Sequence, residues 1–264
     1  MKTVMITGAA SGLGWALSTA AFERGYRVVM VDMNAVLLEA RAEVLGRRDP
    51  QRVASRALDI TDAQALQDLV MWLHNNGERL DVLINNAGIT HRSLAARTAS
   101  SVFRKVMAVD WQAPVDLTLA CMPLLRESRG AIINIGSMAG WMPVLGRAGY
   151  CSAKSALAQF FEVLRAEVAG DGIRVLMVYP SFLDTPIEKN ALGHDGKPAR
   201  HSRSMIGRMQ TPEWMASGIF DALDAGKKRL FPDRFTWFAS LLWRLAPDLY
   251  QKLMVRKFAS ELEQ

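Results

Sequence analysis

Residues 3–14 read TVMITGAASGLG, an apolar run that leads directly into a turn containing three glycines. The apolar and β-branched residues 3–7 predict a strand of a parallel sheet that is buried on both faces. A helical pattern follows the turn and ends at Gly25. Glycine lets the backbone turn tightly and approach a pyrophosphate, and the first N–H groups of the helix are free to bind the anion. The order strand, glycine turn, helix therefore predicts a dinucleotide site.

The second strand, expected at 26–31, ends at Asp32, 18 residues beyond Gly14. A carboxylate at this place can accept hydrogen bonds from both hydroxyls of an adenosine ribose, and it repels a 2′-phosphate. Positions 11, 33 and 34 hold no basic residue that would attract such a phosphate. The sequence therefore predicts NAD as the dinucleotide, with NADP less favoured. The alternative interpretation of Asp32 is an ordinary loop aspartate.

Strand-like and helix-like segments alternate along the rest of residues 1–232, and neither a repeat nor a linker divides them. This alternation predicts an α/β fold of the Rossmann type, with a doubly wound, mostly parallel sheet and helices on both faces. Helices are expected at 34–46, 99–126 and 150–168. Further strands are expected to end at 57–60 and to cover 81–84, 130–135, 173–178 and 228–231.

The composition is that of a globular protein, because 50% of the 264 residues are hydrophobic and 22% are charged. The net charge of +6 argues only weakly for nucleic acid, since residues 226–264 alone carry eight Lys or Arg and four Asp or Glu, a balance of +4. Two cysteines do not make a disulfide framework, which favours a reducing cytoplasm. We therefore expect a cytoplasmic protein that binds no nucleic acid.

Targeting and metal-binding signals are missing from the sequence. The five residues between Lys2 and Gly8 are too few for the apolar region of a signal peptide. No run reaches the roughly 20 apolar residues needed to cross a bilayer. His91, His194 and His201 do not have the spacing of metal ligands, so we expect no metal site.

The sequence YCSAK, residues 150–154, places a phenol and an ammonium four positions apart. On a helix over 150–168 both groups leave the same face, about one turn apart. A nearby ammonium favours the phenolate and so lowers the pKa of a tyrosine, which is about 10 in model peptides. A tyrosine tuned in this way can exchange a proton near neutral pH. The alternative is a surface pair, because this spacing also arises by chance.

Taken together, these segments resemble the short-chain dehydrogenase/reductase family, in its short single-domain branch, over about residues 1–232. The resemblance implies a seven-stranded Rossmann-type sheet with the dinucleotide across the carboxyl ends of the strands. It also implies hydride transfer between nicotinamide C4 and a carbonyl or alcohol carbon. The motifs that carry it are Thr7-Gly8-x-x-x-Gly12-x-Gly14, Asp59, Asn85-Asn86-Ala87-Gly88, Ser137, Tyr150-x-x-x-Lys154 and Pro180-x-x-x-x-Thr185.

The resemblance assigns a role to each of these motifs. Tyr150 is the proton donor in reduction and the acceptor in oxidation, Lys154 lowers its pKa and binds the nicotinamide ribose, and Ser137 hydrogen-bonds the substrate oxygen. The implied cofactor contacts are Gly8, Ser11, Gly12, Leu13 and Gly14 at the pyrophosphate, Asp59 and Ile60 at the adenine, Asn86, Ala87 and Gly88 at the adenosine ribose, and Pro180, Leu183 and Thr185 at the carboxamide.

One departure from the family pattern lies in the expected long helix. The family usually has asparagine where this chain has Asp110, and that residue helps to hold a proton-relay water near the lysine. Aspartate keeps the backbone carbonyl but places a carboxylate near Lys154. A paired lysine stabilises a phenolate less well. We therefore expect an active enzyme with an altered pH optimum.

Two segments are less constrained by the resemblance. Residues 184–211 correspond to the family's mobile flap over the substrate, which sets specificity. Residues 233–264 contain two short amphipathic helical patterns separated at Pro247. We expect this tail to pack on the same domain or on a partner subunit, with a membrane interface as the less favoured alternative.

These features favour an NAD-dependent oxidoreductase that acts on an apolar secondary alcohol or ketone. Members of this family usually oligomerise, so we also expect this protein to form a homodimer or homotetramer. Met138, Trp141 and Met142 belong either to the substrate pocket or to the core. The alternatives are a carbonyl reductase that prefers NADPH, and a catalytically weak dinucleotide-binding or scaffold protein for which Asp110 is the only support.

Overall fold

The computed structural model describes residues 1–199, 209–232 and 234–259 and has a parallel β-sheet at its centre. The strands are β1 (Thr3–Thr7), β2 (Arg27–Asp32), β3 (Val53–Ala57), β4 (Val82–Asn85), β5 (Ala131–Ile135), β6 (Arg174–Val178) and β7 (Arg229–Leu230). They form a seven-stranded sheet in the order β3-β2-β1-β4-β5-β6-β7. The predicted Rossmann-type α/β fold is confirmed.

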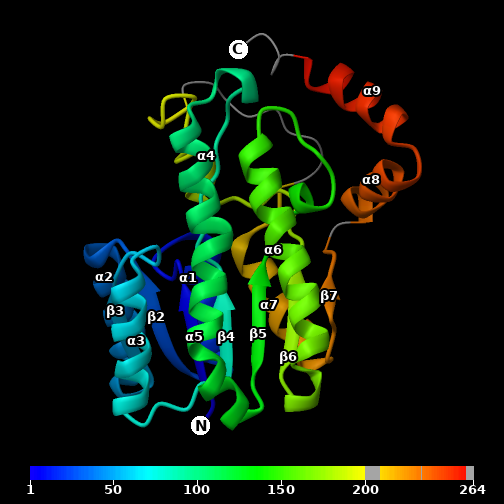
Figure 1. Cartoon of the computed structure of the whole chain (residues 1–264). Helices are drawn as coiled ribbons and strands as arrows, with labels where there is room; N and C mark the ends of the chain where they lie inside the picture. The colour runs from blue at the N-terminus through cyan, green and yellow to red at the C-terminus, as the bar shows by residue number, and fades with distance from the viewer. Residues whose placement is uncertain (200–208, 233, 260–264) are drawn as a thin grey trace.

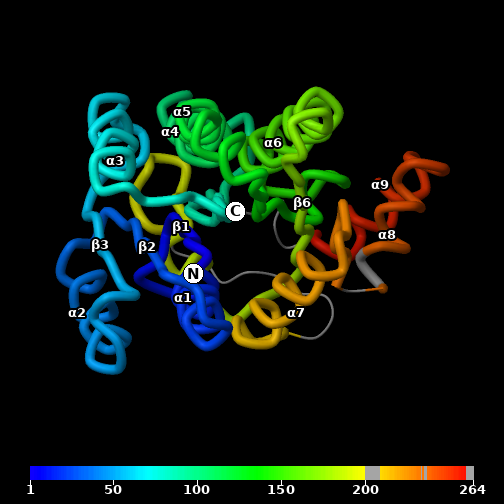
Figure 2. Tube along the Cα trace, turned by 90° about the horizontal axis from the view of Figure 1, so that it is seen from below, coloured from blue at the N-terminus to red at the C-terminus, as the bar shows by residue number. Residues whose placement is uncertain are grey.

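Two layers of helices cover the sheet, one on each face (Figures 1 and 2). The helices are α1 (Gly12–Glu23), α2 (Ala35–Gly46), α3 (Ala63–Asn75), α4 (Ser100–Met107), α5 (Ala113–Ser128), α6 (Ala148–Glu167), α7 (Pro212–Asp224), α8 (Arg234–Leu245) and α9 (Pro247–Lys257). Apolar side chains of α1, α2 and α7 pack on one face, and those of α3, α5 and α6 pack on the other. Every residue of β1 is consequently buried, as its apolar sequence predicts.

The sheet reverses its direction of growth at β1, which pairs with β2 on one side and with β4 on the other. Ile6 is aligned with Met30 of β2 and with Ile84 of β4. The chain therefore builds outward to β3, crosses back to β4 and continues to β7. Such a reversal leaves a crevice beyond the carboxyl ends of the strands, where α/β sheets bind their ligands. The turns after β1 and β4 lie beside each other at this crevice.

These two turns are packed so closely that position 14 accepts only glycine. A Cβ atom on Gly14 would lie 1.9 Å from the carbonyl oxygen of Gly8 and 2.6 Å from Asn86 Nδ2. Asn86 Nδ2 also donates to the carbonyl oxygen of Thr7 at 2.9 Å. The N–H groups of Asn86 and Ala87 both donate to Thr7 Oγ1 at 3.1 Å. The end of β4 is thus held against the end of β1 and its glycine turn.

The helical stretch expected over about 99–126 is present, but one turn in its middle is not α-helical. The structure has α4, then a π-helical segment η3 (Ala108–Gln112), and then α5. Pro114 lacks an N–H group, so it cannot donate to the carbonyl oxygen of Asp110 four residues earlier, and the regular α-helical bond is lost at that point. Asp110 therefore lies in the wider turn, a type of irregularity that is frequent at functional sites.

The helices α8 and α9 lie beyond β7, beside the carboxyl end of the sheet (Figure 1). The Tyr250 hydroxyl donates to the carbonyl oxygen of Pro143 at 2.8 Å. The Arg244 guanidinium lies 3.8 Å from the centroid of the Trp141 ring. Residues 233 and 260–264 of the predicted tail lie outside the described residues. Among the helices that the structure describes, none is both long and apolar enough to cross a membrane.

The loop after Ser137 belongs more to the core than to a pocket. Met138 is buried in the apolar cluster between the sheet and α6. The Trp141 ring makes edge-on contacts with Tyr179 and Phe231, each at a centroid distance of 5.1 Å. Met138 and Trp141 therefore belong to the core and not to a substrate pocket.

Candidate active site

A cavity of about 550 Å³ lies at the carboxyl ends of the strands. Ser137 lines it, as does every residue that the sequence analysis assigned to the cofactor. Their assignment to a cofactor remains a prediction. The lining residues shared with that prediction are Gly8, Ser11, Gly12, Leu13, Gly14, Asp32, Asp59, Ile60, Asn86, Ala87, Gly88, Tyr150, Lys154, Pro180, Leu183 and Thr185.

The N-terminus of α1 fits an anionic group in this cavity. Ser11 occupies its N-cap without a side-chain hydrogen bond to the helix, and the first turn holds no acidic residue. By contrast, Asn34 caps α2 and Asp62 caps α3 through their side-chain oxygens. The first N–H groups of a helix need acceptors, and the positive end of its dipole favours an anion. A pyrophosphate matches both requirements.

Asp32 stands at the end of β2 on the wall of the same cavity. Its Oδ2 accepts the N–H of Ala10 and its Oδ1 accepts the N–H of Asn34, each at 3.0 Å. Each carboxylate oxygen can still accept a further hydrogen bond. The next two residues that line the cavity, Met33 and Asn34, carry no charge. This wall can bind a diol and repels a phosphate.

Ser137, Tyr150 and Lys154 meet where β5 ends and α6 begins. Ser137 follows β5, and its Oγ accepts the N–H of Ala139 at 3.1 Å. Lys154 Nζ donates to the carbonyl oxygen of Ile135 at 3.1 Å and lies 5.7 Å from the centroid of the Tyr150 ring. The expected placement of Tyr150 and Lys154 one turn apart on one helix is confirmed.

Asp110 lies behind Lys154 and does not line the cavity. Its Oδ2 is 3.2 Å from Lys154 Nζ, and the two side chains are 0% and 5% exposed. Its Oδ1 accepts the N–H of Ile89 at 2.8 Å, which joins η3 to the loop after β4. A buried charge is costly unless it is paired and hydrogen-bonded: the two groups pair with each other, while the hydrogen bonds come from the Ile89 N–H to Asp110 and from Lys154 to the Ile135 carbonyl.

Burial and the charges of this pair shift the pKa values of Lys154, Asp110 and Tyr150. Burial lowers the pKa of Lys154, but Asp110 and Tyr150 together outweigh it, so the pKa is raised. Burial raises the pKa of Asp110, although Lys154 and the Ile89 N–H act against it. Burial likewise raises the pKa of Tyr150; Lys154 lowers it, Asp110 raises it and Ser137 lowers it. The expected lowering by Lys154 exists, but a net lowering is wrong for this protein because burial is stronger.

Comparison with known proteins identifies the family. The family model described as "short chain dehydrogenase" matches residues 2–195. The chain is a short-chain dehydrogenase. As a member of this family it is an oxidoreductase of CH–OH groups and binds NAD(P).

The relatives of this dehydrogenase carry related names. It is 31% identical to Dehydrogenase/reductase SDR family member 7B of Bos taurus, over 98% of this chain and 82% of the bovine protein. It is 38% identical to Retinol dehydrogenase 5 of Homo sapiens, over 70% of this chain and 57% of the human protein.

Solved structures agree with the fold over nearly the whole chain. A short-chain dehydrogenase from Streptomyces avermitilis is 27% identical, with a TM-score of 0.80 over 98% of this chain and 99% of that one. A short-chain dehydrogenase from Sphingobium yanoikuyae in complex with NADPH is 25% identical, with a TM-score of 0.80 over 96% and 95% of the two chains. The cavity described above therefore lies in a fold that holds dinucleotides.

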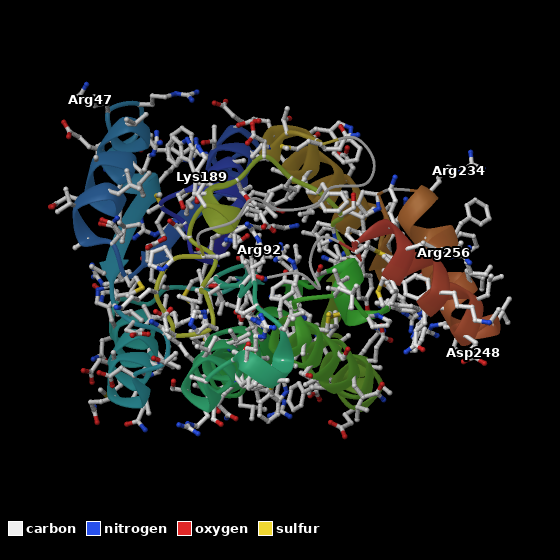
Figure 3. All side chains as sticks on the ribbon, turned by 90° about the horizontal axis from the view of Figure 1, so that it is seen from above. Arg47, Arg92, Lys189, Arg234, Asp248 and Arg256 are labelled. Atoms are coloured by element: carbon white, nitrogen blue, oxygen red, sulfur yellow. The ribbon has the colours of Figure 1, made fainter. Side chains whose placement is uncertain are left out.

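The dehydrogenase contains a buried ionic cluster beside Tyr150 that the sequence analysis missed. Glu188, in the predicted flap, accepts hydrogen bonds at 2.8 Å from both Arg92 and Arg147. Arg147 also donates to Thr90 Oγ1 at 2.8 Å. Figure 3 shows Arg92 near the centre of the molecule, whereas Arg47 lies at its edge. One carboxylate thus joins the loop after β4, the start of α6 and the flap.

His91 supports the start of α6 in the same cluster. Its Nε2 accepts the N–H of Gly149 at 2.9 Å, next to Tyr150, and its Nδ1 lies 3.3 Å from Ser93 Oγ. Burial, together with the nearby charge of Arg147, lowers the pKa of His91 to about 4. At neutral pH the ring is therefore uncharged, so one nitrogen is free to accept the helix N–H.

Only the tertiary structure could identify this cluster. Arg92, Arg147 and Glu188 stand in polar loop sequence, where charged residues are usually solvated. Their one local signal is the position of Arg147, three residues before Tyr150. Backbone hydrogen bonds also hold the described part of the predicted flap. The N–H of Arg92 donates to the carbonyl oxygen of Leu192 at 2.7 Å, and the N–H of Leu192 donates to the carbonyl oxygen of Thr90 at 2.8 Å. Residues 200–208 of the predicted flap lie outside the described residues.

Replacing Glu188 by glutamine should detach this segment from the loop after β4. Arg92 and Arg147 are 5% and 10% exposed, so loss of the Glu188 charge removes an attraction to both guanidinium groups at a place that water reaches poorly. Breaking a buried pair costs about 3 kcal/mol, which corresponds to about 100-fold faster local opening. Hydrogen exchange at the amides of Arg92 and Leu192 measures this opening.

Glu162→Gln is the matched control, because Glu162 is 22% exposed like Glu188 and also binds two arginines. One of these, Arg229, is 44% exposed, so water can replace the lost charge. The control should leave exchange at Arg92 and Leu192 unchanged. Equal exchange in the Glu188 variant and the unmodified enzyme would contradict a role of Glu188 in holding the segment.

Proposed function

We propose that this dehydrogenase transfers a hydride between NAD and the carbon of an apolar secondary alcohol or ketone, with Tyr150 as general acid and base. The observation that carries the proposal is one cavity lined at one place by Ser137, Tyr150 and Lys154 and at another by Asp32. The first group suits proton exchange with a substrate oxygen, and the second suits an adenosine ribose. The enzyme is proposed to be a cytoplasmic homodimer or homotetramer, as expected from its sequence and family.

Tyr150 and Ser137 act on the substrate oxygen in this proposal. In reduction, the Tyr150 hydroxyl gives its proton to the carbonyl oxygen, and in oxidation the phenolate takes the proton from the alcohol. The Ser137 hydroxyl donates a hydrogen bond to the same oxygen and stabilises the charge that develops there. Lys154 stays protonated and favours the phenolate electrostatically. The dinucleotide, when bound, supplies or accepts the hydride at nicotinamide C4.

Asp110 acts as a positioning residue in this proposal. Its contact with Lys154 at 3.2 Å and with the Ile89 N–H at 2.8 Å holds the ammonium between η3 and the loop after β4. The same negative charge raises the pKa of Tyr150. The carboxylate therefore fixes the geometry of the lysine and weakens its effect on the phenol.

Two properties of the cavity support the choice of cofactor and substrate. Asp32 supports NAD, because its charge disfavours a 2′-phosphate and the adjoining residues offer no cation. The similar structure from Sphingobium yanoikuyae holds NADPH, so an NADPH-preferring reductase is the alternative. An apolar substrate is supported by Ile187 in the lining and by the name of the human relative, a retinol dehydrogenase.

Tyr150→Phe tests the proposed reaction. It removes the transferable proton and keeps the ring, so dinucleotide binding should persist while turnover falls by at least about 100-fold. The measurement is a spectrophotometric screen of alcohols and ketones with NAD(H) and NADP(H). Tyr26→Phe is the control, since Tyr26 lies at the start of β2, at the opposite end of the sheet. Equal turnover in the Tyr150 variant and the unmodified enzyme would rule out Tyr150 as the general acid and base.

Asp110→Asn should shift the pH dependence of oxidation. The carboxylate raises the pKa of Tyr150, so its removal lets the phenolate form at lower pH. Because oxidation needs the phenolate, the rising limb of kcat/KM against pH should move to lower pH. The control Asp116→Asn changes an exposed carboxylate on α5 and should leave the profile unchanged. An inactive Asp110→Asn enzyme would mean instead that the carboxylate itself is essential.

Asp32→Asn should reduce the preference for NADH over NADPH. The amide keeps an oxygen for one of the backbone N–H groups and removes the charge that repels a phosphate. We expect the ratio of the two dissociation constants to fall by about tenfold, about 1.4 kcal/mol, in isothermal titration. An unmodified enzyme that binds NADPH more tightly would reverse the cofactor assignment.

A further inference from the structure

The helices α8 and α9 have an inner side that contacts the rest of the enzyme. Ser240, Tyr250 and Met254 are buried on this side. The Tyr250 hydroxyl bonds to the carbonyl of Pro143, and Arg244 lies over the Trp141 ring. These contacts fix the orientation of the two helices and determine which side chains point away from the enzyme.

The side of α8 that faces away from the enzyme is apolar. Positions 237, 238, 241 and 245 fall within an arc of about 100° on a helix with 3.6 residues per turn, so they share this side. The Trp237 and Phe238 rings contact each other at a centroid distance of 4.9 Å. We name this surface the α8 outer face; it comprises Trp237, Phe238, Leu241 and Leu245, which are 39%, 55%, 37% and 76% exposed.

Exposed cations lie on the same two helices. They are Arg234 and Arg244 on α8 and Lys252, Arg256 and Lys257 on α9, whereas Asp248 is the only acidic residue between 234 and 258. Figure 3 shows Arg234 and Asp248 at the outer edge of the two helices. Exposed aromatic and leucine side chains with cations beside them are typical of helices that lie in a membrane interface.

We propose that the α8 outer face docks on an anionic lipid surface. The apolar side chains would enter the boundary between headgroups and acyl chains, while the cations would bind the lipid phosphates. The sequence analysis favoured packing of this tail on protein. The observed inner side accounts for packing, but it leaves the four apolar side chains of the outer face exposed.

A second copy of the enzyme is a weaker occupant of this face for two reasons. The α8 helix is about 18 Å long, so one face about 10 Å wide covers about 200 Å². Even if the exposed Leu249, Leu253 and Val255 of α9 double this area to about 400 Å², it stays below the roughly 800 Å² that each partner buries in a stable interface. A symmetric contact would also bring the cations of one copy close to those of the other. An anionic lipid surface attracts the cations, and it does not need the large contact area of a stable protein interface.

Docking through the α8 outer face would place the cavity end of the enzyme near the lipid surface. The α8 and α9 helices lie beside the carboxyl end of the sheet, the end that holds the cavity (Figure 1). Their inner side contacts the loop at 141–143, which follows Ser137. A docked enzyme would therefore hold this end of the molecule near the lipid. The proposal goes beyond the proposed reaction and does not depend on it.

Co-sedimentation with vesicles tests the proposal. The full-length enzyme should bind vesicles of equal parts phosphatidylcholine and phosphatidylglycerol, and it should bind pure phosphatidylcholine much less. Salt at about 1 M, where the Debye length is about 3 Å, should weaken the binding. Leu245→Glu and Phe238→Glu should each lower the partition constant by at least about tenfold, because a carboxylate replaces an apolar anchor.

Val44→Glu is the matched control, since Val44 is 50% exposed on α2, far from α8, and the variant makes the same change of charge. It should bind vesicles like the unmodified enzyme. No binding by the full-length enzyme, or equal losses in all three variants, would overturn the proposal. Light scattering gives a further test. A loss of oligomer in Leu245→Glu, without vesicle binding by the unmodified enzyme, would identify a second copy as the occupant and would also overturn it.

Discussion

The parallel pairing of β1 with both β2 and β4 is the constraint on which the rest of the site depends. Parallel strands end at the same edge of a sheet, so the reversal at β1 brings the turns of distant segments together at that edge. Asn86 then ties the two turns to each other through the carbonyl of Thr7. The close contact at Gly14 leaves no room for a side chain between them. The cavity, the position of the α1 N-terminus in it and the position of Asp32 in its wall all follow from this arrangement.

Buried charges hold the second half of the site together. Asp110 and Lys154 form one ion pair, and Glu188 with Arg92 and Arg147 forms another cluster. Both connect the loop after β4 to α6, the helix of Tyr150. Such pairs stabilise a fold less than apolar contacts do, but they become costly when one partner is lost. They therefore fix the relative positions of these segments, including the described part of the predicted flap.

The same environment determines the chemistry available to Tyr150. Burial raises the pKa of its phenol, and Asp110 adds to this effect while Lys154 opposes it. An asparagine in place of Asp110 would leave the lysine charge unopposed. The proposed enzyme therefore combines a well-positioned lysine with a phenol that gives up its proton less readily. The α8 outer face is a separate feature, built from residues that neither the sheet nor the ionic clusters require.

The sequence by itself determined the order of strands and helices, the glycine turn, and the Tyr150–Lys154 spacing. These are local properties, because hydrophobic period, backbone freedom and helical repeat act over a few neighbouring residues. Most residues assigned to the cofactor line one cavity for the same reason, since they follow the carboxyl end of a strand or start a helix, whereas Tyr150 and Lys154 lie in the first two turns of α6. Only the tertiary structure decided the burial of Asp110 beside Lys154, the net direction of the Tyr150 pKa, the burial of Arg92 and Arg147 around Glu188, and the two-sided character of α8. Each of these depends on which distant segments exclude water from a side chain, and burial of that kind leaves no period in the sequence.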